Sequence, residues 1–303
     1  MATITAAPSR ATTRAFPLKY FVLAFAFTWV LWVPAALEAR GLISPLPVPA
    51  TFLGAFGPLL AAVVVTAQEG GRAGLRSLLG RVVRWRVAPI WYGVAILGPL
   101  VITLVAITLH VALGGQPPGL GLLIGALPTL VFVSVYMMIT VALGEEVGWR
   151  GYALPALQAR YSALLASLIL GVMWTLWHLP VFFNPDTHYS NLPFLIFLLY
   201  IVPFAVLITW VFNSTGGSVL MAMFFHAVMN ASGGLWKTIP EYSVEPPIAA
   251  EAVAVNVHTN LMPAIVLWIA AIVVVLVYGA RDLSRKPRQV PADAGGESRS
   301  RVQ

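Results

Sequence analysis

Eight long apolar stretches without Asp, Glu, Lys or Arg constrain the fold of this chain more than any other feature. They span residues 20–37, 50–67, 89–113, 121–143, 162–183, 192–213, 218–236 and 262–280. A helix needs about 20 mostly apolar residues to cross the hydrocarbon core of a bilayer. The stretches lack the alternation that is typical of barrel strands, so helices must satisfy the backbone in lipid. The sequence therefore predicts an all-α, polytopic integral membrane helical bundle with about eight transmembrane helices.

The composition agrees with lipid as the solvent for most of the chain. Of 303 residues, 59% are hydrophobic and 10% are charged, whereas about 25% of an ordinary soluble chain is charged. No polar stretch is long enough for a second domain. We expect an N-terminal segment over residues 1–19, one membrane domain over 20–280 and a disordered tail over 281–303. Cysteine is absent, which excludes disulfides, thiolate zinc sites and a cysteine nucleophile.

The basic residues predict the orientation and one partner. Of 18 Lys and Arg residues, all but Arg40 and Lys237 lie on the same set of alternating connections, which includes both termini. The positive-inside rule then places both termini in the cytoplasm. Leucine and valine repeat at helical spacing among five arginines in the 68–88 loop. We interpret this loop as a short helix on the anionic inner leaflet, so the net charge of +7 favours a lipid bilayer over nucleic acid as partner.

Charged residues follow the fourth apolar stretch directly, in the segment GEEVGWRGYALPALQ at residues 144–158. On a helix Glu146 and Arg150 are four residues apart and share a face, so they can pair. Glu145 points about 100° away and has no local counter-ion. Ionisable groups at membrane depth are costly and usually functional, which makes Glu145 a candidate general base. A solvated helix end in the headgroup region explains this segment equally well.

Two later spans carry histidines with a companion one helical turn away. His178 follows Trp174 in WTLWHLP, and His226 precedes Asn230 in FFHAVMN. Residues four apart lie on one face, so His226 and Asn230 can address one partner inside the bundle. Packing is the alternative for His178, and helix–helix hydrogen bonding is the alternative for the second pair. His110 has no such companion and is interpreted as a packing residue.

Spacing brings the first of these groups together. A helical hairpin over residues 145–178 would turn near Tyr161 and Ser162, about midway along the segment. Glu145 and His178 would then lie level, each about 25 Å from the turn at 1.5 Å per residue. This depth requires the fourth span to extend beyond residue 143, with a bend at Gly144.

The motifs resemble those of the CPBP family of intramembrane peptidases, also called the type II CAAX prenyl endopeptidase or Abi family. Its pattern is Glu-Glu-x-x-x-Arg, then Phe-x-x-x-His, then His-x-x-x-Asn, on successive transmembrane helices. The matching residues here are Glu145, Glu146 and Arg150, then His178, then His226 and Asn230. Trp174 stands where the second motif usually has Phe. The resemblance covers about residues 125–240.

The resemblance implies a glutamate-dependent endopeptidase that hydrolyses a peptide bond within the membrane and forms no covalent intermediate. In this family picture Glu145 and His178 activate a water, while His226 and Asn230 form an oxyanion hole. Glu146, Arg150 and Trp174 would support the site structurally. The resemblance further implies no cofactor, a membrane-associated protein or peptide as substrate, and location in a bacterial plasma membrane.

Three alternatives stay open at this point. A zinc metalloprotease could use the same Glu and His residues, although the chain has no HExxH motif and asparagine is a poor zinc ligand. A proton-coupled transporter also needs buried Glu and His, but its two halves should carry matching interrupted helices. Here the polar groups are confined to the second half. An immunity protein that binds a partner without catalysis is the third alternative.

Overall fold

The computed structural model describes residues 15–243 and 249–291, and every regular element within these residues is helical. Eight helical segments are long and apolar enough to cross a membrane. They comprise Leu18–Ala39, Ala50–Val82, Ile90–Ala112, Leu127–Gln158, Ala163–Phe183, Phe194–Ser214, Val219–Thr238 and Ala250–Tyr278. The predicted all-α bundle with eight membrane-spanning helices is confirmed.

The spans are built from the following elements. The first three contain α1 (Leu18–Ala39), α2 and α3 (Ala50–Gly54 and Gly57–Val82) and α4 (Ile90–Ala112). After α5 (Leu120–Gly125), the fourth contains α6 (Leu127–Met137), η1 (Met138–Ala142), α7 (Leu143–Gly148), η2 (Trp149–Ala153) and α8 (Leu154–Gln158). The remaining elements are α9 (Ala163–Trp177), η3 (Leu179–Phe183), η4 (His188–Asn191), α10 (Phe194–Ser214), α11 (Val219–Ser232), η5 (Gly233–Thr238), η6 (Pro240–Tyr242) and α12 (Ala249–Tyr278).

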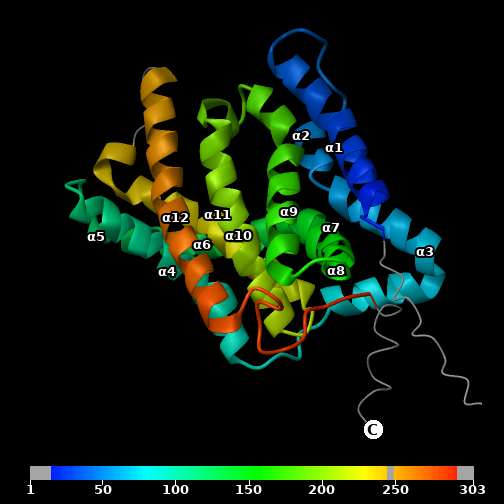
Figure 1. Cartoon of the computed structure of the whole chain (residues 1–303). Helices are drawn as coiled ribbons and strands as arrows, with labels where there is room; N and C mark the ends of the chain where they lie inside the picture. The colour runs from blue at the N-terminus through cyan, green and yellow to red at the C-terminus, as the bar shows by residue number, and fades with distance from the viewer. Residues whose placement is uncertain (1–14, 244–248, 292–303) are drawn as a thin grey trace, which may run out of the picture.

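Helices α10 and α11 form the core of the bundle, since most of their residues are buried. α10 packs against α9 and α12, and α11 packs against α4 and α6. On the other side α3 packs against both α1 and α7. In Figure 1 α12 stands at the left, α9 near the centre, and α1 to α3 at the right. The fourth span thus lies between α11 and α3, and both helices fix its position.

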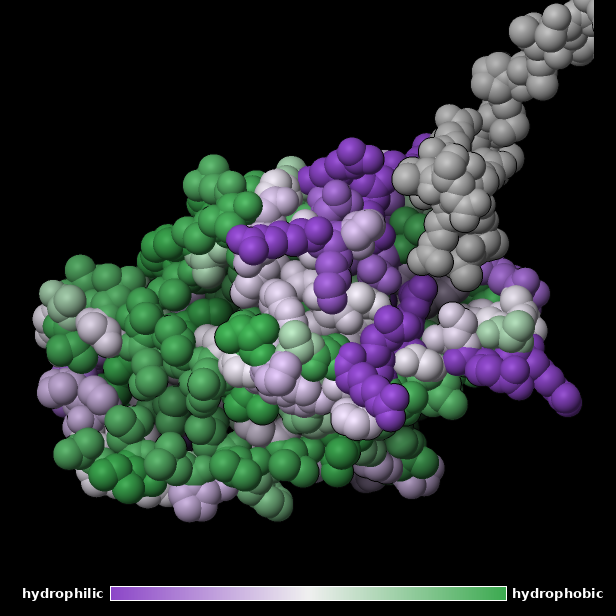
Figure 2. Space-filling model, turned by 90° about the horizontal axis from the view of Figure 1, so that it is seen from below, coloured by the Kyte–Doolittle hydropathy of each residue, from purple (hydrophilic) through white to green (hydrophobic). Residues whose placement is uncertain are grey.

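The last turn before α9 and the segment after α12 meet at one end of the bundle. α8 ends at Gln158 and α9 begins at Ala163, so the turn predicted near Tyr161 and Ser162 is present. The side chain of Ser162 caps α9 by accepting a hydrogen bond from the Leu165 amide. This end is the lower one in Figure 1. Seen from below, hydrophilic residues gather on one part of the face and hydrophobic residues cover much of the rest (Figure 2). That this end faces the cytoplasm stays a prediction.

Residues 281–291, the described part of the predicted disordered tail, pack against this end. Asn213 Nδ2 donates to the Asp282 carbonyl at 2.8 Å, and Gln158 Nε2 donates to the Gln289 carbonyl at 2.9 Å. Arg288 Nε in turn donates to the Gln158 carbonyl at 2.8 Å. These bonds hold the segment because buried amides need partners. The predicted disorder of residues 292–303 and the segment 1–14 fall outside the described residues.

The arginine-rich loop predicted as a surface helix is the second half of α3. Gly71 interrupts α3 with φ +52° and ψ −144°, a conformation that favours glycine, and helix resumes to Val82. Figure 1 shows α3 turning sharply at the right of the bundle. Arg81 Nη1 donates to the Gly151 carbonyl at 3.0 Å, so this arm is attached to the fourth span. The helix is confirmed, and its contact with a leaflet stays a prediction.

Close approach of α3 to α7 depends on Gly148. A Cβ at this position would lie 2.5 Å from the Pro58 backbone carbonyl, which has no room to move within a packed helix pair. We expect Gly148→Ala to lower the thermal midpoint in detergent, with an overpacking cost of about 1–3 kcal/mol. Gly121→Ala is the matched control, since no atom lies within 4 Å of its Cβ. Equal midpoints for the two variants would contradict this packing.

Candidate active site

The fourth span carries the Glu-Glu-x-x-x-Arg motif on a helix that leaves α geometry twice. Extension of this span beyond residue 143 is confirmed, since helix continues to Gln158. The predicted bend at Gly144 is replaced by two π-turns, η1 before α7 and η2 after it. π-Turns insert an extra residue into a helix and often occur at functional sites. The two glutamates therefore sit on a short α-helical segment, α7, with a π-turn on each side.

Glu146 is the centre of a fully buried charge cluster. Its Oε1 accepts hydrogen bonds from Arg150 Nη1 and from His226 Nδ1, each at 2.8 Å. Glu146 and Arg150 are 0% exposed and His226 is 3% exposed. The pairing of Glu146 with Arg150 predicted from spacing is present. Since a carboxylate only accepts hydrogen bonds, the His226 proton in this contact is on Nδ1.

Glu145 points the other way, as helical geometry predicts. Its Oε2 accepts a hydrogen bond of 2.5 Å from Trp174 Nε1 on α9. The Trp174 ring also lies under the Arg150 guanidinium, with 4.6 Å from Cζ to the ring centroid, and against His226 at 5.2 Å between centroids. Trp174 therefore contacts both halves of the motif and holds the two glutamates in fixed relation.

His178 reaches the same place from the end of α9. Its Nδ1 lies 2.9 Å from the Trp174 carbonyl, which only accepts, so Nδ1 carries a proton. In the neutral imidazole Nε2 is then a free acceptor. Glu145 and His178 line one cavity of about 350 Å³, in accord with the prediction that they lie level. The cavity therefore presents two proton acceptors on facing helices.

His226 and Asn230 lie differently from the expectation of a shared partner. His226 is bonded to Glu146, whereas Asn230 is exposed and makes no side-chain hydrogen bond to the described residues. Neither residue is among those that line the cavity of Glu145 and His178. The reason is the packing of α11, which directs His226 at the buried charge cluster and leaves the next turn at the surface. The oxyanion role for this pair stays a prediction.

The placement of possible ligands bears on the zinc alternative. Within residues 15–243 and 249–291, no three His, Cys, Asp or Glu side chains are arranged to hold one metal ion. Glu145 bonds to an indole, and His226 Nδ1 is bonded to Glu146. Zinc ligation by the motif residues would therefore require them to rearrange.

Sequence comparison agrees with the motif resemblance. The family described as "Type II CAAX prenyl endopeptidase Rce1-like" matches residues 126–232. CAAX prenyl protease 2 of Methanococcus maripaludis is 30% identical over 227 residues, which cover 71% of this chain and 82% of that protein. The chain belongs to the type II CAAX prenyl endopeptidase family. As a member of this family it is a membrane peptidase, as the motifs predicted.

The region matched to the type II CAAX endopeptidases contains every predicted site residue but only part of the cavity wall. Trp32 on α1 and Thr51 on α2 lie outside that region and also line the cavity, and within the region Thr187, directly before η4, and Tyr189 in η4 line it too. Sequence reasoning missed them because single aromatic or hydroxyl residues carry no pattern. The first 120 residues, which show no motif, therefore supply part of the active-site cavity.

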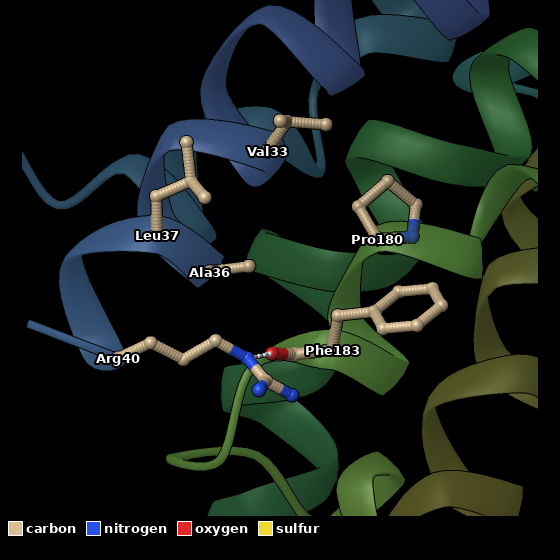
Figure 3. Close-up of a pocket in the computed structure, with 6 residues that line it drawn as sticks. All are labelled: Val33, Ala36, Leu37, Arg40, Pro180 and Phe183. Carbon is tan, nitrogen blue, oxygen red and sulfur yellow. Dashed lines mark hydrogen bonds between the residues drawn. The ribbon is translucent and has the colours of Figure 1, made fainter. Parts of the chain in front are cut away.

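A second pocket lies on the other side of the contact between α1 and η3. Its volume is about 290 Å³, and it is lined by Val33, Ala36, Leu37, Arg40, Pro180 and Phe183. Arg40 Nε donates to the Phe183 carbonyl at 2.7 Å, as Figure 3 shows. None of the predicted site residues lines this pocket. Its importance for the active site is indirect, since the bond ties η3, which follows His178 directly, to α1.

His110 is more than the packing residue predicted from the sequence. Its Nδ1 lies 2.9 Å from His258 Nε2 on α12, and its Nε2 lies 2.7 Å from Glu241 Oε1 in η6. These partners are 131 or more positions away in the chain, so helical spacing gives no signal of them. The cluster joins α4, η6 and α12 and is separate from the cavity of Glu145 and His178.

Proposed function

We propose that this membrane endopeptidase hydrolyses a peptide bond with a water molecule activated by Glu145 and His178. The observation that carries the proposal is that both side chains face one cavity within the bundle, each with an acceptor available. Hydrolysis requires an acceptor for the proton of the attacking water, and a positioned carboxylate or imidazole serves in this way. No residue forms a covalent intermediate in this mechanism.

Glu146 and Arg150 support this site without touching substrate. The Glu146–Arg150 pair holds α7 in its rotation. The indole N–H of Trp174 orients the Glu145 carboxylate by donating a hydrogen bond to it. The family pattern assigns the oxyanion to His226 and Asn230. With Nδ1 engaged by Glu146, His226 donates from Nε2 only as an imidazolium.

The substrate we propose is a membrane-associated protein or peptide, because the catalytic groups lie inside a membrane-spanning bundle. The name of the Methanococcus maripaludis relative refers to prenylated CAAX substrates. A prenylated substrate for this chain is tested by comparing cleavage of one peptide with and without a prenyl group. A bacterial plasma membrane with both termini cytoplasmic remains the proposed location.

The zinc alternative differs from this mechanism in whether peptide cleavage requires a bound metal ion. We expect the purified protein to cleave a membrane peptide with less than stoichiometric zinc, and to retain its rate after incubation with a chelator and removal of that chelator. The reason is that the motif residues are bonded to each other rather than arranged around one ion. Stoichiometric metal, with activity lost on its removal and restored by zinc, would overturn the proposal in favour of a metalloprotease.

A further inference from the structure

The cavity wall contains hydrogen-bond acceptors but few hydrogen-bond donors that are not already bonded. Glu145 and His178 Nε2 accept, whereas most donors in the wall are already used by the backbone. Their bonds are Trp32 Nε1 to the Thr51 carbonyl, Thr140 Oγ1 to the Tyr136 carbonyl and Thr187 Oγ1 to the Val181 carbonyl. A peptide carbonyl that gains negative charge in this cavity needs a donor that is not committed elsewhere.

Two lining hydroxyls remain, those of Thr51 and Tyr189, and neither side chain makes a hydrogen bond to the described residues. The Tyr189 ring lies against His178, with 5.6 Å between centroids, and at 5.3 Å from Phe197. Thr51 lies on α2, at an exposed position across the cavity wall. The phenol is also the more acidic donor of the two, which strengthens a hydrogen bond to a developing oxyanion.

The loop that carries Tyr189 is held in place by its own hydrogen bonds. Thr187 Oγ1 donates to the Val181 carbonyl at 2.7 Å, and Ser190 Oγ donates to the Thr187 carbonyl at 2.9 Å. The Asp186 amide donates to Asn184 Oδ1 at 2.9 Å. A donor acts on a transition state only if it is positioned in advance. Tyr189 meets this condition, because both sides of its loop are fixed.

The charge state of the phenol also fits a donor. Burial, and after it the negative charge of Glu145, raise the pKa of the Tyr189 hydroxyl above its ordinary value. The hydroxyl therefore keeps its proton throughout the physiological range. Glu145 and Tyr189 line the same cavity. Donor and base thus face the same space.

We propose that the Tyr189 hydroxyl is a catalytic hydrogen-bond donor to the oxyanion formed during peptide hydrolysis, an inference that rests on the proposed function. Water oxygen bonds to the carbonyl carbon as one of its protons passes to Glu145, while His178 Nε2 accepts a hydrogen bond from the remaining O–H. The carbonyl electron pair moves to oxygen, which accepts the Tyr189 hydrogen bond. When the intermediate collapses, the C–N bond breaks and the stored proton goes to the amine nitrogen. Tyr189 keeps its own proton at every step.

The test is Tyr189→Phe in the full-length protein, assayed on a cleavable membrane peptide. We expect kcat to fall by about 10²-fold, the effect of losing one oxyanion donor, with KM changed less than threefold. A tetrahedral phosphinic peptide inhibitor should lose affinity in parallel. The control is Tyr92→Phe, which removes a phenol bonded to the Trp85 carbonyl, away from the cavity. Its kcat should stay unchanged.

The outcomes separate this inference from the function on which it rests. Without cleavage by the wild-type protein the proposed function fails. If the wild type cleaves the peptide and Tyr189→Phe keeps near-normal kcat, the hydrolytic function stands and the donor role is wrong. The hydroxyl bonds to no described residue, so we expect an unchanged thermal midpoint. A lower midpoint with weaker substrate and inhibitor binding alike would show a structural role and overturn the inference.

Discussion

Glu145→Gln is expected to lower the rate of peptide hydrolysis by roughly 10²- to 10⁴-fold, the usual contribution of a general base. The amide has nearly the shape of the carboxylate, and its oxygen can still accept the Trp174 hydrogen bond. It cannot take a proton from water. The measurement is the initial rate on a cleavable membrane peptide, with the thermal midpoint in detergent as a check that the variant is folded.

The control for this variant is Glu69→Gln. Glu69 is exposed on α3 and accepts hydrogen bonds from the Tyr152 hydroxyl, which an amide oxygen can also accept. Its removal changes the net charge by the same amount without touching the cavity. We expect the control to retain its full rate. Near-normal turnover by Glu145→Gln would show that the general base is another residue.

Glu146→Gln is expected to affect folding far more than Glu145→Gln does. The substitution leaves the Arg150 guanidinium, which is 0% exposed, without its counter-charge. Breaking a buried ion pair on one side costs about 3–5 kcal/mol. The thermal midpoint and the yield of folded protein in detergent should both fall. A double variant, Glu146→Gln with Arg150→Gln, should recover part of this loss because the unpaired cation is gone.

Substitution of the two neighbouring glutamates is thus expected to have different effects, a loss of rate at Glu145 and a loss of stability at Glu146. A Glu146→Gln protein that is fully stable yet wholly inactive would show that Glu146, and not Glu145, is the general base. Recovery in the double variant distinguishes a charge effect from a packing effect, since both variants have amides at position 146. The single observation behind this contrast is that Glu146 is bonded to two cationic or ionisable partners, while Glu145 accepts from a neutral indole.

The sequence predicts the spans well because lipid leaves a backbone few choices. The pairing of Glu146 with Arg150 was also predictable, since it follows from positions four apart on one helix. The beginning of α12 was not. The apolar run starts at residue 262, yet helix starts at Ala249, because polar residues such as His258 find partners on α4 and η6. Hydropathy marks the part of a helix in lipid, and not where the helix begins.

The arrangement of the motif residues could be predicted only in part. Level placement of Glu145 and His178 follows from counting residues in a hairpin. Bonding of His226 to Glu146 depends on how α11 is rotated against α7, which is set by packing over the whole bundle. The same rotation leaves Asn230 at the surface. The wall residues from α1, α2 and the loop after η3 come from long-range contacts that no local pattern records.

The two π-turns have a consequence for how the family can vary. A deletion of one residue within Met138–Ala142 would let that turn close into α-helix, and α7 would keep nearly the same angular phase relative to α6, because the π-turn holds one extra residue in about the same rotation. A deletion of one residue within α6, which is regular α-helix, would instead rotate Glu145 by about 100° away from the cavity. Adding or removing a whole turn before η1 would leave the phase almost intact. The π-turn therefore absorbs a one-residue change in length that elsewhere in this span would turn Glu145 away from the cavity.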